Sequence, residues 1–206
     1  MINLKKYFSN LSPEQLEKYN SLIPLYRSWN SKVNLISRRD IENLYINHIL
    51  HSLAIIKIIK FKEGTNILDV GTGGGFPGIP LSIFFPKVNF TLLDSIGKKI
   101  KVVEDISKNL SLNNVKAVNG RVEDHNDKYD FVVSRAVSKM DKFYSMVNKN
   151  IKSKSLNELP NGIISLKGGN LEKELKDHKN NKVFEISDFF NEDFFQTKKV
   201  VYVPYL

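Results

Sequence analysis

Three glycines at alternate positions, Gly71, Gly73 and Gly75, follow an apolar segment that carries an acidic residue, Asp69. Glycine tolerates positive φ angles and has no side chain, so a ligand can lie directly against such a turn. A helical pattern follows the turn, and the first backbone amides of a helix have no partner within the helix. The acid, the glycines and the helix start together predict a binding site for a small molecule.

A second acidic residue, Asp94, follows Asp69 by 25 positions and closes the next apolar segment. A carboxylate at the end of the second strand of an open α/β sheet can accept hydrogen bonds from the hydroxyls of an adenosine ribose. The two acids, with the glycine turn between them, therefore predict that the ligand is a nucleoside.

The spacing of the glycines bears on which nucleoside binds. A dinucleotide site has the pattern G-x-G-x-x-G, and a P-loop requires a lysine followed by serine or threonine. The turn in this chain reads D-x-G-x-G-x-G and has neither feature. Its pattern suits S-adenosylmethionine, which has no phosphates. A nicotinamide cofactor, and a glycine turn that holds no ligand, are the alternatives.

The elements that must position these residues alternate between short strands and helices from Gly64 onward. This alternation predicts an α/β fold with a mostly parallel, Rossmann-like sheet. Only a short stretch separates the last two strands, so the last strand is expected to run antiparallel. The expected strands are residues 66–70, 89–93, 115–118, 131–134, 162–167, 183–186 and 199–203.

The first 60 residues have the pattern of helices. Ser12 can cap a helix, Pro13 suits its first position, and Gln15 can bond back to the cap. Apolar residues then recur at spacings of three and four, which is typical of one buried helix face. Pro24 is expected to kink this helix or to split it in two.

Ser37 is expected to cap a second helix, and Arg38 and Arg39 beside it are either phosphate contacts or a charge cluster at the helix start. The pattern changes to alternating strands and helices shortly after this helix, without a flexible linker. We therefore expect an N-terminal helical segment, residues 1–62, and a cofactor-binding domain, residues 63–206.

Composition excludes several classes of protein. The chain has no cysteine, which excludes disulfides, cysteine-ligated zinc, iron–sulfur clusters and thiol nucleophiles. No cluster of His, Asp and Glu has metal-site spacing, so no metal is expected. The net charge of +9 favours a polyanionic partner, although weakly. No apolar stretch is long enough to span a membrane or to form a secretory signal, so we expect a cytoplasmic protein.

Several segments, in order, resemble one family, the 16S ribosomal RNA small-subunit methyltransferase G family (RsmG, also called GidB). The longest are LDVGTGGGFPGIPLS at residues 68–82 and LLDSIGKK at residues 92–99. Shorter matches lie at residues 34–37, 47–53, 120–123, 133–137 and 166–168. Several matches in the family's order are more specific than any one of them alone.

The resemblance implies a class I methyltransferase domain preceded by a small helical segment. It implies transfer of a methyl group from S-adenosylmethionine to N7 of one guanosine of 16S rRNA, in the loop near position 527. The cofactor contacts expected from the resemblance, together with the acid of the ribose argument, are Gly71, Phe76, Asp94, Val122, Glu123 and Arg135. The ring of Phe76 is expected either to contact the cofactor or base or to pack under the following helix.

The expected partner is 16S rRNA or the small ribosomal subunit, and the chain is expected to be a monomer. Ligands of an open α/β sheet bind at the carboxyl ends of its strands, and the basic residues expected there are Arg121, Arg135 and Lys167. The family usually has an aspartate where this chain has His51, which leaves open the role of the turn between His48 and His51.

The residues also agree with methylation at N7. Methylation of pyrimidine C5 needs a cysteine nucleophile, and methylation of an exocyclic amine generally uses a polar–Pro–Pro–aromatic motif where this chain has Ser134 to Val137. Guanine N7 carries a lone pair and no proton, so it needs alignment with the methyl group and no general base. We therefore assign no catalytic residue. A non-catalytic RNA-binding module is a further alternative.

Overall fold

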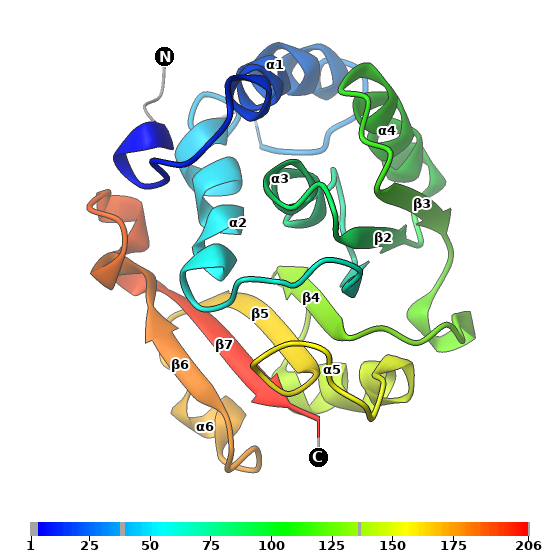
Figure 1. Cartoon of the computed structure of the whole chain (residues 1–206), viewed down its shortest axis with the longest axis vertical. Coiled ribbons are helices and arrows are strands. Elements are labelled where there is room, and N and C mark those ends of the chain that lie inside the picture. The colour runs from blue at the N-terminus through cyan, green and yellow to red at the C-terminus, as the bar shows by residue number, and fades with distance from the viewer. Residues whose placement is uncertain (1–3, 38–39, 136, 206) are drawn as a thin grey trace.

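Figure 1 shows the computed structural model of the chain, which describes residues 4–37, 40–135 and 137–205. Its centre is a seven-stranded sheet with the order β3-β2-β1-β4-β5-β7-β6. Strands β1 to β5 are parallel, and β7 is antiparallel to both of its neighbours. The strands are β1 (Asn66–Val70), β2 (Asn89–Asp94), β3 (Val115–Asn119), β4 (Phe131–Arg135), β5 (Gly162–Gly168), β6 (Lys182–Glu185) and β7 (Lys198–Pro204). The expected fold and its antiparallel last strand are confirmed.

Helices cover both faces of the sheet (Figure 1). One face carries α1 (Pro13–Asn30), α2 (His51–Leu53), α3 (Gly78–Phe84) and α4 (Gly97–Asn109), and the other carries α5 (Met140–Val147) and α6 (Glu172–Leu175). The shorter helical turns are η1 (Leu4–Lys6), η2 (Tyr45–Leu50), η3 (Ala54–Lys57), η4 (Val122–Asp124), η5 (Asn148–Asn150), η6 (Ile186–Asp188) and η7 (Asp193–Thr197).

Side chains of successive residues on the central strands pack on opposite faces of the sheet. Ile67 belongs to the apolar cluster beneath α1 to α4, and Leu68 belongs to the cluster beneath α5 and α6. Val133 and Val132 divide in the same way on β4. Side chains of a strand alternate between its two faces, so a strand covered by helices on both sides is apolar at most positions.

Helix α1 begins as predicted and is not split at Pro24. The Ser12 hydroxyl accepts a 3.1 Å hydrogen bond from the backbone N–H of Gln15, whose side-chain oxygen accepts one of 3.0 Å from the N–H of Ser12. The prediction of a break at Pro24 was wrong about splitting, because α1 is one helix of 18 residues that includes Pro24. Pro24 is exposed, so water can bond the carbonyl that the proline leaves without a donor.

The second helical region starts later than predicted. Ser37 accepts a 3.1 Å bond from the backbone N–H of Asp40, but the continuous helical run begins at Leu44 and passes through η2, α2 and η3. A 2.9 Å bond from the side-chain amide of Asn47 to Asp40 fixes the turns before it. Arg38 and Arg39 lie outside the described residues.

The N-terminal helices share one hydrophobic cluster with the sheet and its α3 and α4 helices. Polar contacts also join them: the indole N–H of Trp29 donates to a carboxylate oxygen of Asp105 on α4 at 2.7 Å. The hydroxyl of Tyr7 donates to Glu192, just before η7, at 3.0 Å. The division of the chain at residues 62 and 63 stays a prediction.

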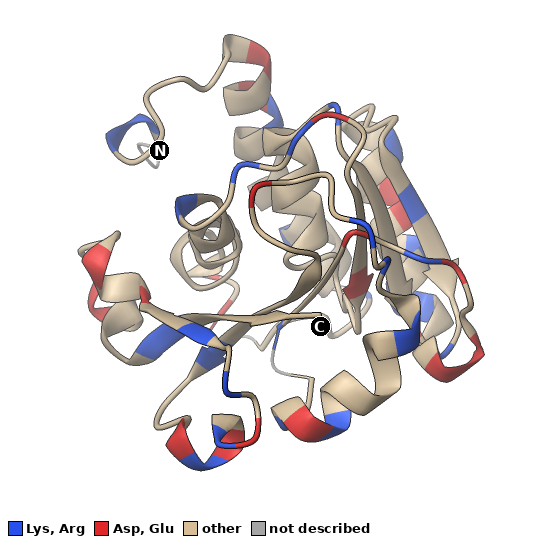
Figure 2. Cartoon of the chain, turned by 60° about the horizontal axis from the view of Figure 1, so that its bottom comes forward, with Lys and Arg blue, Asp and Glu red and all other residues tan. Residues whose placement is uncertain are grey.

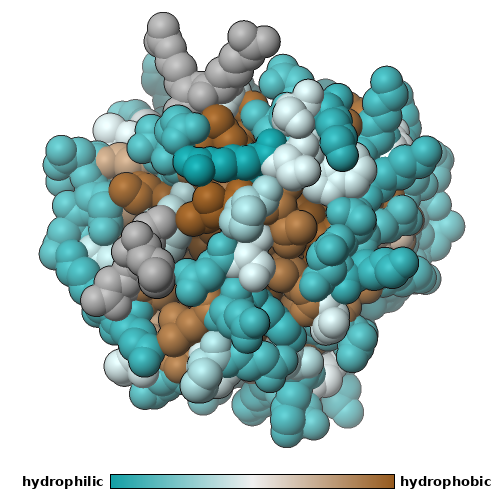
Figure 3. Space-filling model, turned by 90° about the horizontal axis from the view of Figure 1, so that it is seen from above, coloured by the Kyte–Doolittle hydropathy of each residue, from teal (hydrophilic) through white to brown (hydrophobic). Residues whose placement is uncertain are grey.

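The surface carries charges of both signs on helices and loops (Figure 2). Seen from above, apolar side chains reach the surface in patches crossed by hydrophilic ones (Figure 3). Among the residues that the structure describes, no helix is both long and apolar enough to cross a membrane.

Candidate functional site

The glycine turn connects β1 to α3, and its backbone conformation requires glycine. Gly71 has φ +67° and Gly73 has φ +59°, in the left-handed region that other residues rarely adopt. The backbone N–H of Gly71 donates to the carbonyl of Leu93 on β2 at 2.9 Å. A Cβ atom at Gly71 would lie 3.1 Å from a methyl group of Val137, so the turn runs close against the segment after β4.

Asp69 holds the turn from below. One of its carboxylate oxygens accepts a 2.6 Å bond from the hydroxyl of Thr72 and a 2.8 Å bond from the backbone N–H of Gly78, the first residue of α3. The other oxygen has no hydrogen-bond partner among the described residues. Complete burial raises the pKa of Asp69 to about 7. Asp69 therefore positions the turn and is covered by it.

Asp94 closes the turn from the side of β2. One carboxylate oxygen accepts a 2.9 Å bond from the N–H of Gly73, and the other accepts a 2.9 Å bond from the N–H of Ile96. Each carboxylate oxygen has two acceptor positions. Asp94 is thus fixed by the backbone and keeps acceptor capacity for a pair of hydroxyl groups.

A first cavity of about 360 Å³ opens beside Gly71 and Asp94. Five of the predicted site residues line it: Gly71, Asp94, Arg121, Val122 and Glu123. The last three come from the end of β3 and from η4. The parallel strands thus bring together, at the carboxyl edge of the sheet, residues that are up to 52 positions apart in the sequence.

A second cavity of about 590 Å³ lies next to the first, and Val137 lines both. Its lining residues are Asp40, Asn47, His48, His51, Arg135, Val137, Ser138, Lys139, Leu166, Lys167, Gly168, Leu171, Glu174, Phe194 and Lys198. Two more predicted residues, Arg135 and Lys167, lie here and not in the first cavity. The N-terminal helical segment, β4, β5 and the start of β7 all contribute to this second cavity.

Phe76 lines neither cavity, and its ring packs beneath the turn. The ring of Tyr26 stacks on it with centroids 4.7 Å apart, and the guanidinium carbon of Arg135 lies 5.0 Å from the centroid of Phe76. The side chain therefore belongs to the core and supports Arg135. A cofactor contact of Phe76 through its main chain stays a prediction.

Arg135 is largely buried at the end of β4. It donates a 3.3 Å hydrogen bond to the carbonyl of Asn47, and its cation lies over the face of Phe76. Burial lowers the pKa of Arg135 to about 10, so the group stays charged at neutral pH. This gives the second cavity a fixed positive charge.

Lys167 and Arg121 differ in how free their charges are. The ammonium of Lys167 forms a 2.6 Å ion pair with Glu174 and donates a 2.7 Å bond to the carbonyl of Ser138. Arg121 is exposed at the mouth of the first cavity. The prediction that Lys167 faces RNA stays untested, and the geometry favours a structural ion pair for it.

The two histidines of the second cavity are neutral. Burial lowers the pKa of His48 to about 3 and that of His51 to about 3. His48 packs against Phe76, with ring centroids 5.2 Å apart, and His51 packs against the ring of Phe194 at 5.5 Å. Among the described residues no group of three His, Cys, Asp or Glu side chains could hold a metal ion.

Side chains from α1 donate hydrogen bonds to main-chain carbonyls of the turn and of α3. The hydroxyl of Tyr26 donates to Gly74 at 2.7 Å, and that of Tyr19 donates to Pro80 at 2.8 Å. The side-chain amide of Gln15 donates to the carbonyl of Ile83 at 3.0 Å. The sequence pattern placed the two tyrosines in one apolar stripe and Gln15 in the helix cap, and it gave no sign that their polar ends hold the turn.

Sequence reasoning missed several lining residues. Ile96, Lys99 and Met146 complete the first cavity, and Asp40, Phe194 and Lys198 belong to the second. Ile96 could have been found from the sequence, because it lies two positions after Asp94, the last residue of β2. The other residues come from elements whose neighbours in space cannot be read from local sequence.

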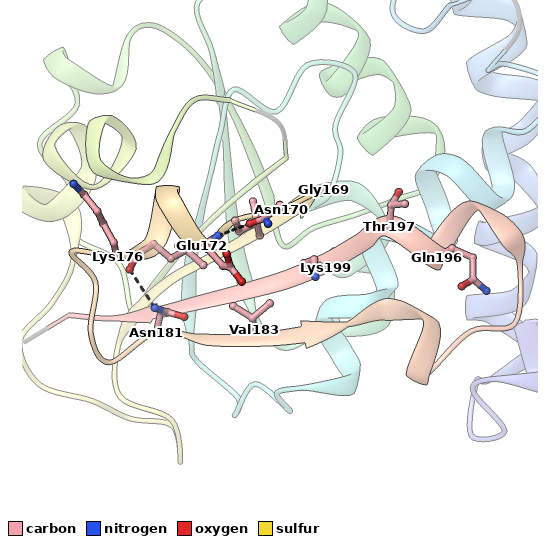
Figure 4. Close-up of a pocket in the computed structure, with 11 residues that line it drawn as sticks. Gly169, Asn170, Glu172, Lys176, Asn181, Val183, Gln196, Thr197 and Lys199 are labelled. Atoms are coloured by element: carbon pink, nitrogen blue, oxygen red, sulfur yellow. Dashed lines mark hydrogen bonds between the residues drawn. The ribbon is translucent and has the colours of Figure 1, made fainter.

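A third cavity, of about 680 Å³, lies against β6, β7 and α6 (Figure 4). It shares Leu171 with the second cavity and no residue with the first. Polar side chains such as Asn170 and Asn181 line it, and they bond within their own loops. None of the predicted site residues lies there.

Comparison with known proteins points to one family. The family model for rRNA small subunit methyltransferase G matches residues 13–200. A protein from Christiangramia forsetii named ribosomal RNA small subunit methyltransferase G is 56% identical, over 98% of this chain and 95% of the relative. One of the same name from Cytophaga hutchinsonii is 52% identical, over 98% of each chain. The crystal structure of a SAM-dependent methyltransferase from Aquifex aeolicus matches the fold with TM-score 0.59 and 18% identity, over 83% of this chain and all of that one.

Proposed function

Since the chain belongs to the rRNA small subunit methyltransferase G family, we propose that it transfers a methyl group from S-adenosylmethionine to N7 of a guanosine in 16S rRNA, near position 527. The family makes it an S-adenosylmethionine-dependent rRNA methyltransferase. Neither a nicotinamide-dependent oxidoreductase nor a non-catalytic RNA-binding module finds support in the relatives.

The observation that carries the proposal is the pair of cavities that meet at Val137. Methyl transfer from a bound cofactor to an RNA base needs two neighbouring sites whose reacting atoms approach closely. The first cavity has the glycine turn and the acid that a nucleoside needs. The second cavity has a volume of about 590 Å³, in the range of about 300–1,000 Å³ usual for ligand sites, and it opens beside the first.

The residues of the first cavity fit the cofactor. Asp94 offers acceptor positions for the ribose hydroxyls, and Gly71 leaves the main chain bare where a side chain would fill the space. Val122 and Glu123 also line this cavity. When bound, S-adenosylmethionine supplies a methyl group made electrophilic by its positively charged sulfur.

Methyl transfer to N7 requires no general base from the chain. The N7 lone pair of guanine forms the new C–N bond while the bond between methyl carbon and sulfur breaks and its electrons return to sulfur. N7 carries no proton, so no base is needed, and the positive charge passes to the purine. The second cavity must therefore hold the base in line and exclude competing water.

We also propose that the chain acts as a monomer in the cytoplasm, where ribosomal subunits are assembled. The substrate is either free 16S rRNA or the small subunit. Each form can be offered to the purified chain with labelled cofactor, and the form that accepts the label is the substrate.

Mass mapping of 16S rRNA tests the activity. Ribosomal RNA from cells that lack this protein should gain one methyl group, on a guanosine near position 527, after incubation with the chain and S-adenosylmethionine. Reverse transcription after chemical cleavage at N7-methylguanosine then locates it. Methylation of another atom or another nucleotide would refute this assignment.

A further inference from the structure

We propose that Asp40 binds the Watson–Crick edge of the target guanine in the second cavity and so makes the site specific for guanine. The inference rests on the proposed function, since it assigns a residue for recognition of that enzyme's base. Asp40 comes from the turns before η2, in the N-terminal helical segment, and it lines the cavity together with Arg135 and Asn47.

Among the described residues, two carboxylates line the second cavity, those of Asp40 and Glu174, and the second is already engaged. An oxygen of Glu174 accepts a 2.7 Å bond from the backbone N–H of Met140 and forms a 2.6 Å ion pair with Lys167. These two contacts of Glu174 link α6 to α5 and to β5, and the ammonium of Lys167 compensates the charge of Glu174. Asp40 is the carboxylate of this cavity that can take a ligand.

Asp40 is held in position by neutral donors. One carboxylate oxygen accepts a 2.9 Å bond from the side-chain amide of Asn47, and the other accepts a 3.0 Å bond from the hydroxyl of Ser37. These bonds keep the pKa of Asp40 below its usual value, with smaller contributions from His48 and Arg135. The group is therefore an oriented anion, and each oxygen keeps a second acceptor position.

Guanine has a matching pair of donors. Its N1–H and one N2–H point in the same direction from the Watson–Crick edge, and a carboxylate can accept both. Adenine has an acceptor at N1, which a carboxylate would repel. A guanine held by this edge turns the opposite side of its ring, with N7, away from Asp40. Val137 lines both cavities, so the second cavity adjoins the first, and the proposal places N7 on the side that adjoins it.

The same contact favours the reaction. The purine ring becomes positively charged as the methyl group is transferred, so an anion at its far edge binds the transition state more tightly than the ground state. Lys139 and Lys198, which also line the cavity, are available for the phosphates that flank the extruded base. The cavity thus separates base recognition from backbone contact.

Inosine provides the test, because it lacks only the N2 amino group of guanosine. Two RNA fragments carry guanosine or inosine at the target position, and single-turnover methylation is measured at saturating S-adenosylmethionine. Loss of one hydrogen bond to a charged group should lower the rate about 10-fold or more. The wild-type chain should therefore methylate inosine about 10-fold or more slowly than guanosine. The Asp40→Ala variant should be slow on both RNAs, with a ratio near one.

The controls separate the possible failures. Asp40→Asn provides a second variant, and S-adenosylmethionine binding shows that each variant is folded. Glu42→Ala removes a charge two residues away, on an exposed side chain paired with Arg27, and should keep the wild-type ratio. An unchanged guanosine-to-inosine ratio in both Asp40 variants would overturn the inference. Failure of the wild-type chain to methylate the guanosine RNA at N7 would overturn the proposed function instead.

Discussion

The hydroxyl of Tyr26 donates a 2.7 Å hydrogen bond to the carbonyl oxygen of Gly74, so a helix of the N-terminal segment holds the glycine turn of the sheet. Both groups are buried, and the ring of Tyr26 also stacks on Phe76 beneath the turn. The conformation of the cofactor turn therefore depends on a residue nearly 50 positions earlier in the sequence.

Removal of that hydroxyl should weaken the turn. Tyr26→Phe leaves the carbonyl of Gly74 buried without a donor, which should lower the free energy of unfolding by about 1–3 kcal/mol and reduce S-adenosylmethionine affinity. Urea denaturation and titration calorimetry measure the two effects. Tyr144→Phe removes the same atom from α5, on the other face of the sheet, and should leave cofactor affinity unchanged. Equal affinities of the wild type and Tyr26→Phe would contradict the role given to this bond.

Alanine substitution at two glycines, both with positive φ, can separate an effect on cofactor binding from an effect on stability. Gly71 has φ +67° and a Cβ there would lie 3.1 Å from Val137, whereas Gly64 has φ +81° and open space around it. Both alanine variants should lose about 1 kcal/mol of stability from the positive φ. Only Gly71→Ala should reduce S-adenosylmethionine affinity, by about 10-fold or more, because its methyl group enters the first cavity. Equal binding by the two variants in calorimetry would refute the pocket assignment.

Asp69 should make stability depend on pH. Its pKa in the folded chain, about 7, lies above the ordinary value of 3.8, so the native state binds more protons than the unfolded state between these values. The free energy of unfolding contributed by this residue should therefore fall as the pH rises from about 4 to about 7. Asp69→Asn keeps an oxygen for Thr72 and Gly78 and removes the titration. Urea midpoints of both chains across this pH range should differ in slope, and parallel curves would contradict the raised pKa.

Arg121 and Lys167 should behave differently toward RNA. Loss of one phosphate contact lowers the slope of log affinity against log salt by about one. Arg121→Gln should show this change in a filter-binding series with 16S rRNA fragments, because its cation is exposed. Lys167→Gln should keep the slope and lower the free energy of unfolding by about 2 kcal/mol, because Glu174 loses its partner. The reverse pattern would show that Lys167 leaves its ion pair to bind RNA.

The sequence correctly predicted those elements that depend on interactions between residues close together in the chain. The Ser12 cap and the strands at residues 66–70 and 131–134 follow from residue types and spacing over a few positions. Pro24 does not split α1 because an exposed proline leaves a carbonyl that water can satisfy, and exposure is a property of the tertiary structure. The start of the helical run near Tyr45 depends on a bond between Asp40 and Asn47 that no local pattern encodes.

The first cavity was largely predictable, whereas for the second the sequence predicted Arg135 and Lys167 but not the cavity that joins them. The residues around Gly71 and Asp94 lie at the carboxyl ends of adjacent parallel strands, and the fold places such residues together. The second cavity joins Asp40, Arg135 and Lys198, which come from the N-terminal turns, β4 and β7. Their proximity is set by how the helical segment packs on the sheet, and only the three-dimensional structure gives that.

The chain's single tryptophan lies where the helical segment meets the sheet domain, since Trp29 on α1 bonds Asp105 on α4. Indole fluorescence is sensitive to hydration of its ring, so this residue is an intrinsic optical reporter of whether α1 is seated. Detachment of α1 would free the turn that Tyr26 holds. One emission spectrum can therefore follow, without any label, the packing on which the two cavities depend.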